Sequence, residues 1–501
     1  MKALLLYKDK DFDMSAELSR FDEALIRDLE LSAMFKAMAK EDRFIAEAVK
    51  KIVLTSLRDA ESIRYRQDIL KDCINNPEVI RSMYALAVET IKSEKEHYFG
   101  IFSRDHPSSI LHRSVDVLMM FVNMLKRLKK TADAHSDKFK SEGFKVFFGM
   151  IKRELSDDYF GEVQDHLQRL KFNQGVLISA ELGKSNTSDN YVLRKPHETK
   201  GGWVKRVLSK RPQEYTFYIA ERDESGAKIL SGLRDRGINL VANALAQSND
   251  HILSFFNMLR TELGFYVGCL NLYDRLAAKG EPVCFPDPAD IKERRHSFAG
   301  LYDVCLTLLI DGKVVGNDVN ADNKDLVIIT GANQGGKSTF LRSVGVAQLM
   351  MQCGMFVPAE SFCANICGGL FTHFKREEDA SMKSGKFDEE LSRMSDIVDN
   401  IKPGSMILFN ESFAATNERE GSEIARQITG ALLEKRIKVF FVTHQYDFAH
   451  GYHMKRARNS LFLRAERQPD GTRTFKLTEG EPLETAYGED LYTEIFGHTP
   501  Q

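Results

Sequence analysis

Several features that would narrow the function of a protein are missing from this sequence of 501 residues. The net charge is only −2, from 70 basic and 72 acidic side chains, so no global basic field indicates a nucleic-acid-binding protein. A local basic surface is still compatible with this balance. The N-terminal apolar run is short and lacks a signal-peptide cleavage site, and no other run could span a bilayer. These absences predict a cytoplasmic protein without a membrane partner.

Cysteine is also scarce. The seven cysteines are scattered, and only Cys363 and Cys367 lie close together in the sequence. A zinc site there would need two more ligands, for which Cys353 and His373 are the nearby candidates. The alternative is a set of reduced, mostly buried thiols, as expected in a cytosolic protein.

Changes of pattern along the chain predict four parts, since the length is too great for one hydrophobic core. Apolar residues recur at helical spacing in residues 1–171 and again in 226–286, which predicts one helical unit. Between them, residues 172–225 contain the β-rich runs GVLISAEL and EYTFYIAERD and predict a small β-containing insertion.

Residues 287–501 show a different pattern, in which apolar strand candidates alternate with helical runs. That alternation is typical of an α/β domain with a largely parallel sheet. A hairpin is expected near the end, turning at Asp470–Gly471. The strand candidates are DLVIIT, GGLFTHF, SMILFN and KVFFVTH.

The first of these strands leads into TGANQGGKST, which fits the phosphate-loop pattern G-x-x-x-x-G-K-[ST]. Glycines let successive backbone N–H groups point at phosphate oxygens, and the helix that follows directs its positive end at the anion. Lys337 would supply charge to the terminal phosphates and Ser338 would reach Mg²⁺. The pattern alone does not distinguish ATP from GTP. The residues expected to bind the nucleotide are Gly331, Ala332, Asn333, Gln334, Gly335, Gly336, Lys337, Ser338 and Thr339.

A second motif, MILF followed by Asn410 and Glu411, is expected to hold the metal and the general base. Glu411 is the candidate base. Asn410 stands where an aspartate would be preferred; its amide oxygen can accept a hydrogen bond from a metal-bound water but brings no charge. We therefore expect Ser338 and Asn410 to hold Mg²⁺ weakly, and turnover to be slow. His444, after the strand VFFVT, would sense the γ-phosphate or orient water, unless it is structural.

Taken in order, these motifs make residues 316–488 resemble the ATPase domain of the MutS family of DNA mismatch repair proteins. The resemblance implies a P-loop NTPase domain of the ABC/MutS-like type, preceded by an all-helical lever or core domain with a clamp-like insertion. It also implies ATP and Mg²⁺ as cofactors, a homodimer with composite sites, and a clamp that nucleotide opens and closes around DNA. The segments that carry it are GNDV (316–319), TGANQGGKST (330–339), GMFVPAE (354–360), FTHFKREED (371–379), ATNEREG (415–421), His444 and ETAYGEDL (484–491).

The sequence departs from the family pattern at three places, of which Asn410 is the first. In the family, an S-T-F-M-x-E-M signature completes the partner subunit's nucleotide site; here Ser384, Gly385 and Lys386 stand at its start, while Phe387 and Glu390 match. Lys386 would supply a charge in place of the hydroxyls. Third, we expect no N-terminal mismatch-reading domain, because the chain is too short to hold one.

Two basic segments, 125–145 and 194–211, are candidate DNA contacts, because lysine and arginine on an exposed loop neutralise phosphates with little sequence preference. The second is favoured because it lies in the β insertion and carries the only tryptophan, which could stack on a base. The alternative is a solvated surface with the tryptophan buried. The candidates are Lys195, Lys200, Trp203, Lys205, Arg206, Lys210 and Arg211.

Two functions follow from these observations. The first is a MutS-like, ATP-dependent DNA-binding protein, acting in mismatch repair or on branched DNA as a dimeric clamp with a slow Mg²⁺-dependent ATPase. The second is a nucleotide-gated interaction protein that hydrolyses ATP weakly or not at all and grips a protein or RNA partner.

Overall fold

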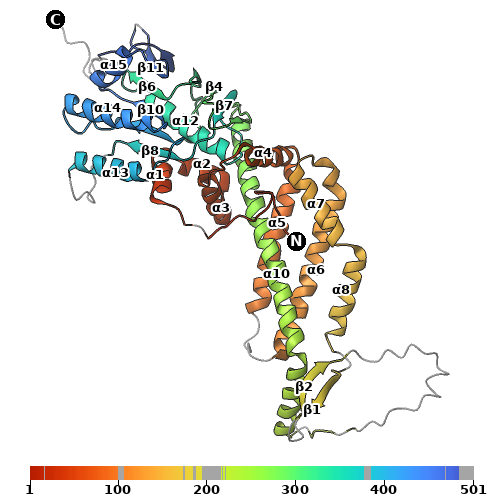
Figure 1. Ribbon diagram of the computed structural model, residues 1–501. Coiled ribbons are helices and arrows are strands. Elements are labelled where there is room, and N and C mark those ends of the chain that lie inside the picture. The colour runs from red at the N-terminus through yellow and green to blue at the C-terminus, as the bar shows by residue number, and fades with distance from the viewer. Residues whose placement is uncertain are drawn as a thin grey trace. The chain divides into compact units, whose positions relative to one another are not determined.

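The computed structural model describes residues 1–15, 17–99, 107–172, 175–183, 188–194, 216, 218–220, 222–376, 385–468 and 470–484 (Figure 1). The chain divides into two compact units. The first comprises residues 1–3, 81–137 and 146–260, and the second comprises 4–80, 138–145 and 261–501. The four-part division drawn from the sequence stays a prediction. In the described part of the chain, no helix combines the length and apolar character needed to cross a bilayer.

The first unit consists mainly of long helices, as the spacing of its apolar residues predicts. Pro77 and Pro107 each occupy the first position of a helix, where a missing N–H is tolerated. Phe121 and Phe256 stack with their ring centroids 6.2 Å apart and belong to the buried core. The elements that lie wholly or partly in this unit are α5 (Pro77–Phe99), α6 (Pro107–His135), α7 (Glu142–Glu154), α8 (Asp157–Arg169) and α10 (Glu224–Ala278).

A small antiparallel hairpin belongs to the same unit. Its first strand, β1 (Ile178–Leu182), lies in the predicted run GVLISAEL, but its second, β2 (Ser188–Leu193), lies where the sequence pattern predicted no strand. The aromatic Tyr191 and the β-branched Val192 suit a strand. The strand was missed because it begins with polar residues, which do not show an apolar pattern. The second predicted run, EYTFYIAERD, falls largely outside the described residues, and those of its residues that are described form no strand.

The second unit opens with four helices, and three of them begin at a residue whose side chain caps the helix. Ser19 and Asp22 form a reciprocal capping box, while Asp42 and Asp59 accept hydrogen bonds from backbone N–H groups of the helices they precede. These helices are α1 (Arg20–Asp28), α2 (Ser32–Ala39), α3 (Arg43–Leu54) and α4 (Ala60–Asn75).

The predicted, largely parallel sheet is confirmed. Its strand order is β12-β11-β6-β10-β9-β8, and all neighbours pair in parallel except β11 and β12. The strands β6, β9 and β10 are almost wholly buried, which matches their continuous apolar runs. The strands are β6 (Leu326–Gly331), β8 (Leu370–Phe374), β9 (Met406–Asn410), β10 (Lys438–Val442), β11 (Ser460–Arg467) and β12 (Arg473–Glu479).

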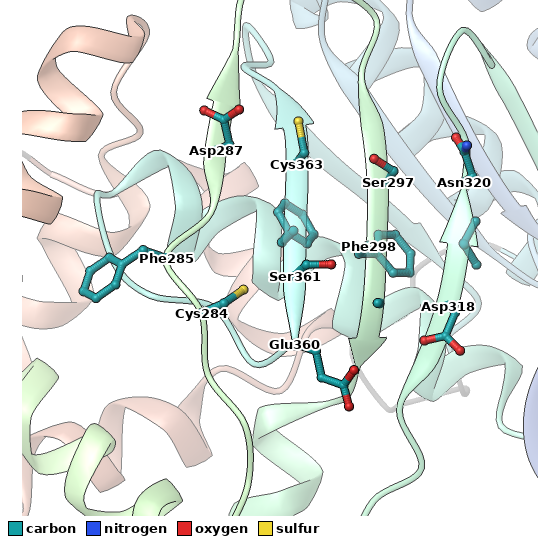
Figure 2. A pocket seen from close by; sticks show the side chains of 13 residues that line it. Cys284, Phe285, Asp287, Ser297, Phe298, Asp318, Asn320, Glu360, Ser361 and Cys363 are labelled. Carbon is teal, nitrogen blue, oxygen red and sulfur yellow. The ribbon is translucent and has the colours of Figure 1, made fainter.

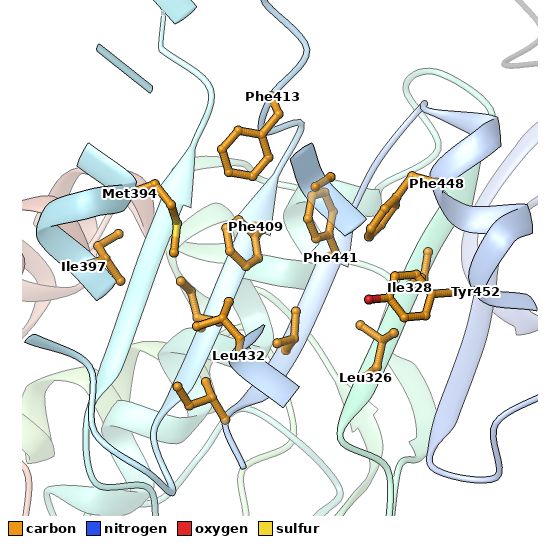
Figure 3. Packing of buried hydrophobic residues seen from close by; sticks show 14 of the residues in the cluster. Leu326, Ile328, Met394, Ile397, Phe409, Phe413, Leu432, Phe441, Phe448 and Tyr452 are labelled. Carbon is orange, nitrogen blue, oxygen red and sulfur yellow. The ribbon is translucent and has the colours of Figure 1, made fainter. Parts of the chain in front are cut away.

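Helices cover both faces of this sheet. On one face, Ile407 and Phe409 of β9 join an apolar cluster in which Phe409 stacks on Phe441 at 4.7 Å (Figure 3). Side chains alternate along a strand, so Leu408 points to the other face, where it lies against Gly345 of α12. The covering helices are α12 (Lys337–Gln352), α13 (Lys386–Asn400), α14 (Glu418–Glu434) and α15 (Tyr446–Met454).

The far end of α12 is fixed by the buried side chain of Gln352. Its Nε2 donates to the Leu57 carbonyl at 3.2 Å and to the Cys367 carbonyl at 3.0 Å, and its Oε1 accepts from the Cys367 N–H at 2.9 Å. The Leu57 N–H in turn donates to the Gln352 carbonyl at 2.8 Å. One residue therefore joins α12 to the α3–α4 connection and to the loop before β8.

A second sheet of four short strands, in the order β3-β7-β4-β5, was not predicted as a separate layer. One face of it is open and forms a hollow of about 670 Å³ (Figure 2). Cys363 lines this hollow, whereas Cys367 is buried, with its Sγ 2.9 Å from Gln352 Oε1. The elements are β3 (Asp287–Ala289), β4 (His296–Leu301), β5 (Asn317–Asn320) and β7 (Ser361–Asn365), with the short helix α11 (Val304–Leu309) after β4.

Candidate nucleotide-binding site

The predicted phosphate loop connects the end of β6 to the start of α12. Gly331 has a φ of 106° and Gly336 a φ of 84°, backbone conformations that glycine adopts without strain. Gly336 is the N-cap of α12 and has no side chain with which to cap it. The first N–H groups of α12 are therefore left to an external acceptor, and the helix dipole favours an anion there.

Lys337, the first residue of α12, is buried and folded back on the loop. Its Nζ donates to the carbonyls of Gly331 and Ala332 at 2.9 and 2.8 Å. Burial lowers the pKa of Lys337 to about 8; Glu411 opposes this shift and Arg473 adds to it. An incoming anion would favour the charged form further, because opposite charge stabilises the ammonium ion.

Ser338 and Asn410 meet although they lie 72 residues apart in the chain. The Ser338 hydroxyl donates to Asn410 Oδ1 at 2.9 Å, across from the phosphate loop at the tip of β9. A hydroxyl and an amide oxygen are ligands of the kind that Mg²⁺ accepts, directly or through water. These two residues fit the predicted metal site, and they do so without a carboxylate.

Glu411 and His444 form the second pair, at the tips of β9 and β10. Glu411 Oε1 lies 3.0 Å from His444 Nε2, and each side chain is 32% exposed. The hydrogen bond from His444 lowers the pKa of Glu411, so this carboxylate is ionised at neutral pH. Glu411 also has a φ of 54°, an uncommon conformation for a non-glycine residue. Such strain is often found at functional positions.

One cavity of about 390 Å³ brings together Lys337, Ser338, Glu411 and His444. The phosphate loop, Glu411 and His444 line one part of it. The rest combines an apolar wall, of a kind that suits a flat ring, with the polar side chains of Asp303, Lys313, Asn317 and Ser343. That wall consists of Leu301, Tyr302, Leu306, Ile310, Val314, Val315 and Phe475.

Comparison with known proteins gives two domain matches. Residues 58–279 match the MutS2 N-terminal domain, and residues 327–491 match MutS domain V. The chain belongs to the MutS family.

Individual MutS-family relatives cover smaller parts of the chain. The DNA mismatch repair protein MutS of Clostridium kluyveri is 29% identical over 250 residues, which are 48% of this chain and 28% of that protein. The protein of the same name from Thermotoga sp. strain RQ2 is 31% identical over 213 residues, 42% of this chain and 26% of that one. MutS protein homolog 4 of Mus musculus is 27% identical over 252 residues, 48% and 25% respectively. The matched part of the chain thus spans 25% to 28% of the length of these relatives.

The MutS-like signature segment lies away from the cavity of its own chain. Gly385 is the N-cap of α13 and Lys386 its first residue, and neither belongs to the residues that line the cavity. Ser384 lies outside the described residues. Glu390, which matches the MutS signature, is buried on α13, and burial raises the pKa of its carboxyl.

The predicted DNA contacts cannot be assigned a position. The seven candidates, from Lys195 to Arg211, lie outside the described residues, so the contact stays a prediction.

Sequence reasoning predicted the hairpin, which is confirmed as β11–β12, but missed the apolar wall and the position of the hairpin beside the loop. Phe475 comes from β12, far from the phosphate loop in sequence. Its unusual backbone conformation, a φ of 57° at a non-glycine residue, can be seen only in the structure. Val314 and Val315 directly precede the MutS-like GNDV segment, which could have pointed to them. Arg473, at the start of β12, was missed for the same reason as Phe475.

Proposed function

We propose that the protein is a Mg²⁺-dependent ATPase that binds ATP in the cavity between the phosphate loop and the tips of β9 and β10. The observation that carries the proposal is the convergence of two pairs, Ser338 with Asn410 and Glu411 with His444, on the loop that begins α12. The apolar wall would take the base and the backbone N–H groups of the loop would take the phosphates.

The proposed hydrolysis uses the residues as follows. Lys337 exchanges its bonds to the Gly331 and Ala332 carbonyls for phosphate oxygens. Glu411, held ionised by His444, accepts a hydrogen bond from the attacking water and polarises it. Ser338 and Asn410 would hold Mg²⁺, which neutralises charge on the phosphates when bound.

Asn410 makes this a slow ATPase in our proposal. A full charge at 4 Å is worth about 4 kcal/mol at an effective dielectric of 20, and less at a position beyond the first ligand shell. The metal therefore binds more weakly than it would beside an aspartate.

The direct test measures binding of ATP to the full chain and to Lys337→Ala. Binding by the natural chain and its loss in the variant are expected. A Lys337→Ala chain that binds ATP normally would refute the phosphate-loop assignment.

We propose DNA as the partner and a homodimer as the working form. This rests on membership of the MutS family, on similarity to two proteins named as DNA mismatch repair proteins, and on the basic segment 194–211. In a dimer, Ser384, Gly385 and Lys386 would complete the partner's site.

The test compares duplex, mismatched and branched DNA, with and without ATP, at low salt. Absence of binding to every form would count against DNA as the partner.

A second candidate is an interaction protein that holds ATP and grips a protein or RNA. It is favoured by Asn410, which brings no charge to the metal, and by Gly385, which brings no side chain to the signature. Asn410→Asp separates the two. A large gain in turnover would favour the ATP-holding protein, whereas an unchanged rate would mean that asparagine is compatible with the ATPase.

A further inference from the structure

The hairpin β11–β12 forms a wall of the phosphate loop. A Cβ added to Gly331 would lie 2.8 Å from the Ala465 nitrogen, and one added to Gly335 would lie 2.6 Å from the Ala465 Cβ. A Cβ added to Gly336 would lie 3.5 Å from the Phe475 Cβ, which is an ordinary contact distance. The glycines of the motif are therefore needed for the approach of this hairpin as well as for that of a phosphate.

The position of the hairpin is fixed from two sides. β11 pairs in parallel with β6 as far as the pair Ala465–Gly331. Asn317, at the start of β5, donates through Nδ2 to the Phe475 carbonyl at 3.3 Å and accepts through Oδ1 from the Leu477 N–H at 2.7 Å. The start of β12 is thus held beside the loop by partners outside the hairpin.

Arg473 uses this position to contact the loop itself. Its Nε donates to the Asn333 carbonyl at 3.1 Å, and its Nη1 donates to the Gly471 carbonyl at 2.6 Å. The residue that follows Asn333 is Gln334, which holds a φ of 57° without being glycine. A bond to the carbonyl before it fixes the peptide plane whose N–H belongs to Gln334, at the rim of the cavity.

The guanidinium also adds charge. Arg473 and Lys337 both donate to carbonyls of the phosphate loop, at Asn333 and at Gly331 and Ala332, so the two cations share one neighbourhood. Two cations repel each other until an anion lies between or beside them, and a di- or triphosphate would relieve this repulsion.

We propose that Arg473 is a positioning residue of the nucleotide site, which fixes the Asn333–Gln334 peptide and adds a second positive charge for the phosphates of the nucleotide. This inference rests on the proposed nucleotide binding. It assigns to the hairpin a part in phosphate binding that the phosphate-loop pattern does not contain.

The test uses the full chain and three variants, Arg473→Gln, Arg473→Lys and the control Arg467→Gln. Arg467 pairs with Arg473 across the hairpin and donates to the Gln468 carbonyl, so it tests the effect of removing an arginine from the same hairpin. Titration calorimetry with ADP would give the affinity at several salt concentrations, and adenosine competition would report binding without phosphates. Thermal melting of each variant checks that it folds.

We expect Arg473→Gln to weaken ADP binding about tenfold, as for loss of one charge-assisted bond. Its salt dependence should become shallower and adenosine binding should stay the same. Arg473→Lys should recover most of the affinity, because it keeps the charge and a donor, and Arg467→Gln should match the natural chain.

Three results would overturn the inference: equal ADP affinity in Arg473→Gln and Arg467→Gln, no recovery in Arg473→Lys, or an equal loss of ADP and adenosine affinity. The last would mean that the side chain only supports the hairpin. Failure of the natural chain to bind ADP would instead overturn the proposed function, so the two failures are distinguishable.

Discussion

Two regions of this protein place their apolar side chains differently: the strands that carry the candidate site in the second unit, and the exposed surface of β1 and α10 in the first. In the second unit, Phe409 and Phe441 are fully buried directly beneath Asn410 and His444. In the first unit, Leu182 and Leu240 are 79% and 76% exposed. The comparison indicates that the candidate site rests on closely packed strands, where small side-chain substitutions reduce stability. Substitutions at these surface positions of the first unit should change stability little.

The largest effect is expected where the packing is densest. Phe441→Ala removes a buried ring whose centroid lies 4.7 Å from that of Phe409 and 4.6 Å from that of Phe448. The free energy of unfolding of the second unit should fall by about 3–5 kcal/mol, because the cavity left behind closes only in part. Urea denaturation followed by circular dichroism measures this. A loss below about 1 kcal/mol would mean that the sheet tolerates repacking far better than its burial indicates.

The second prediction concerns chemistry rather than packing. Glu411→Gln keeps the size of the side chain but removes the ionised oxygen, so ATP hydrolysis should fall about 10²- to 10³-fold while ATP binding persists. Steady-state phosphate release and equilibrium titration measure the two separately. Glu423→Gln, on the exposed side of α14, is the matched control and should hydrolyse ATP at the natural rate. Equal rates in both variants would remove Glu411 from the mechanism.

The third prediction uses acid to probe the layer between the two sheets. His296 is fully buried among Phe298, Phe362 and Phe440, and burial holds the pKa of its ring well below 6.5, with Lys438 adding to the shift. The unfolded chain takes up this proton near pH 6.5 and the folded chain does not. Stability is therefore complete above that pH and is lost as the pH falls below it, by up to about 1.4 kcal/mol per unit.

His296→Phe should remove this part of the acid sensitivity. Urea unfolding at pH 7.5 and 5.5 would show a smaller difference for the variant than for the natural chain. His450→Phe, on the half-buried face of α15, serves as the control. The same pH dependence in all three chains would contradict the assignment to His296.

The smallest effect is expected in the first unit. Leu240→Ser replaces an exposed leucine of α10. The free energy of unfolding of the first unit should change by no more than about 0.5 kcal/mol. A loss comparable to that of Phe441→Ala would show that this surface is covered in solution and would blur the contrast between the units.

Much of the second unit could be predicted because its signals are local. A continuous apolar run followed by Gly331 or by Asn410 and Glu411 marks the end of a buried strand, and glycines are required where the backbone turns left-handed. The wall formed by Phe475 and the bond from Arg473 to Asn333 left no such signal, because they depend on which strands become neighbours. The strands β3 and β5 were missed because each has too few residues to show a period.

The bonds of Gln352 fix the C-terminal end of α12. A helix of 16 residues is a stiff rod about 24 Å long. If phosphates draw its first turn forward, the displacement is not absorbed along the rod but arrives at the amide that grips Leu57 and Cys367. We therefore expect that a ligand in the pocket would act on the backbone ahead of α4 through this one side chain.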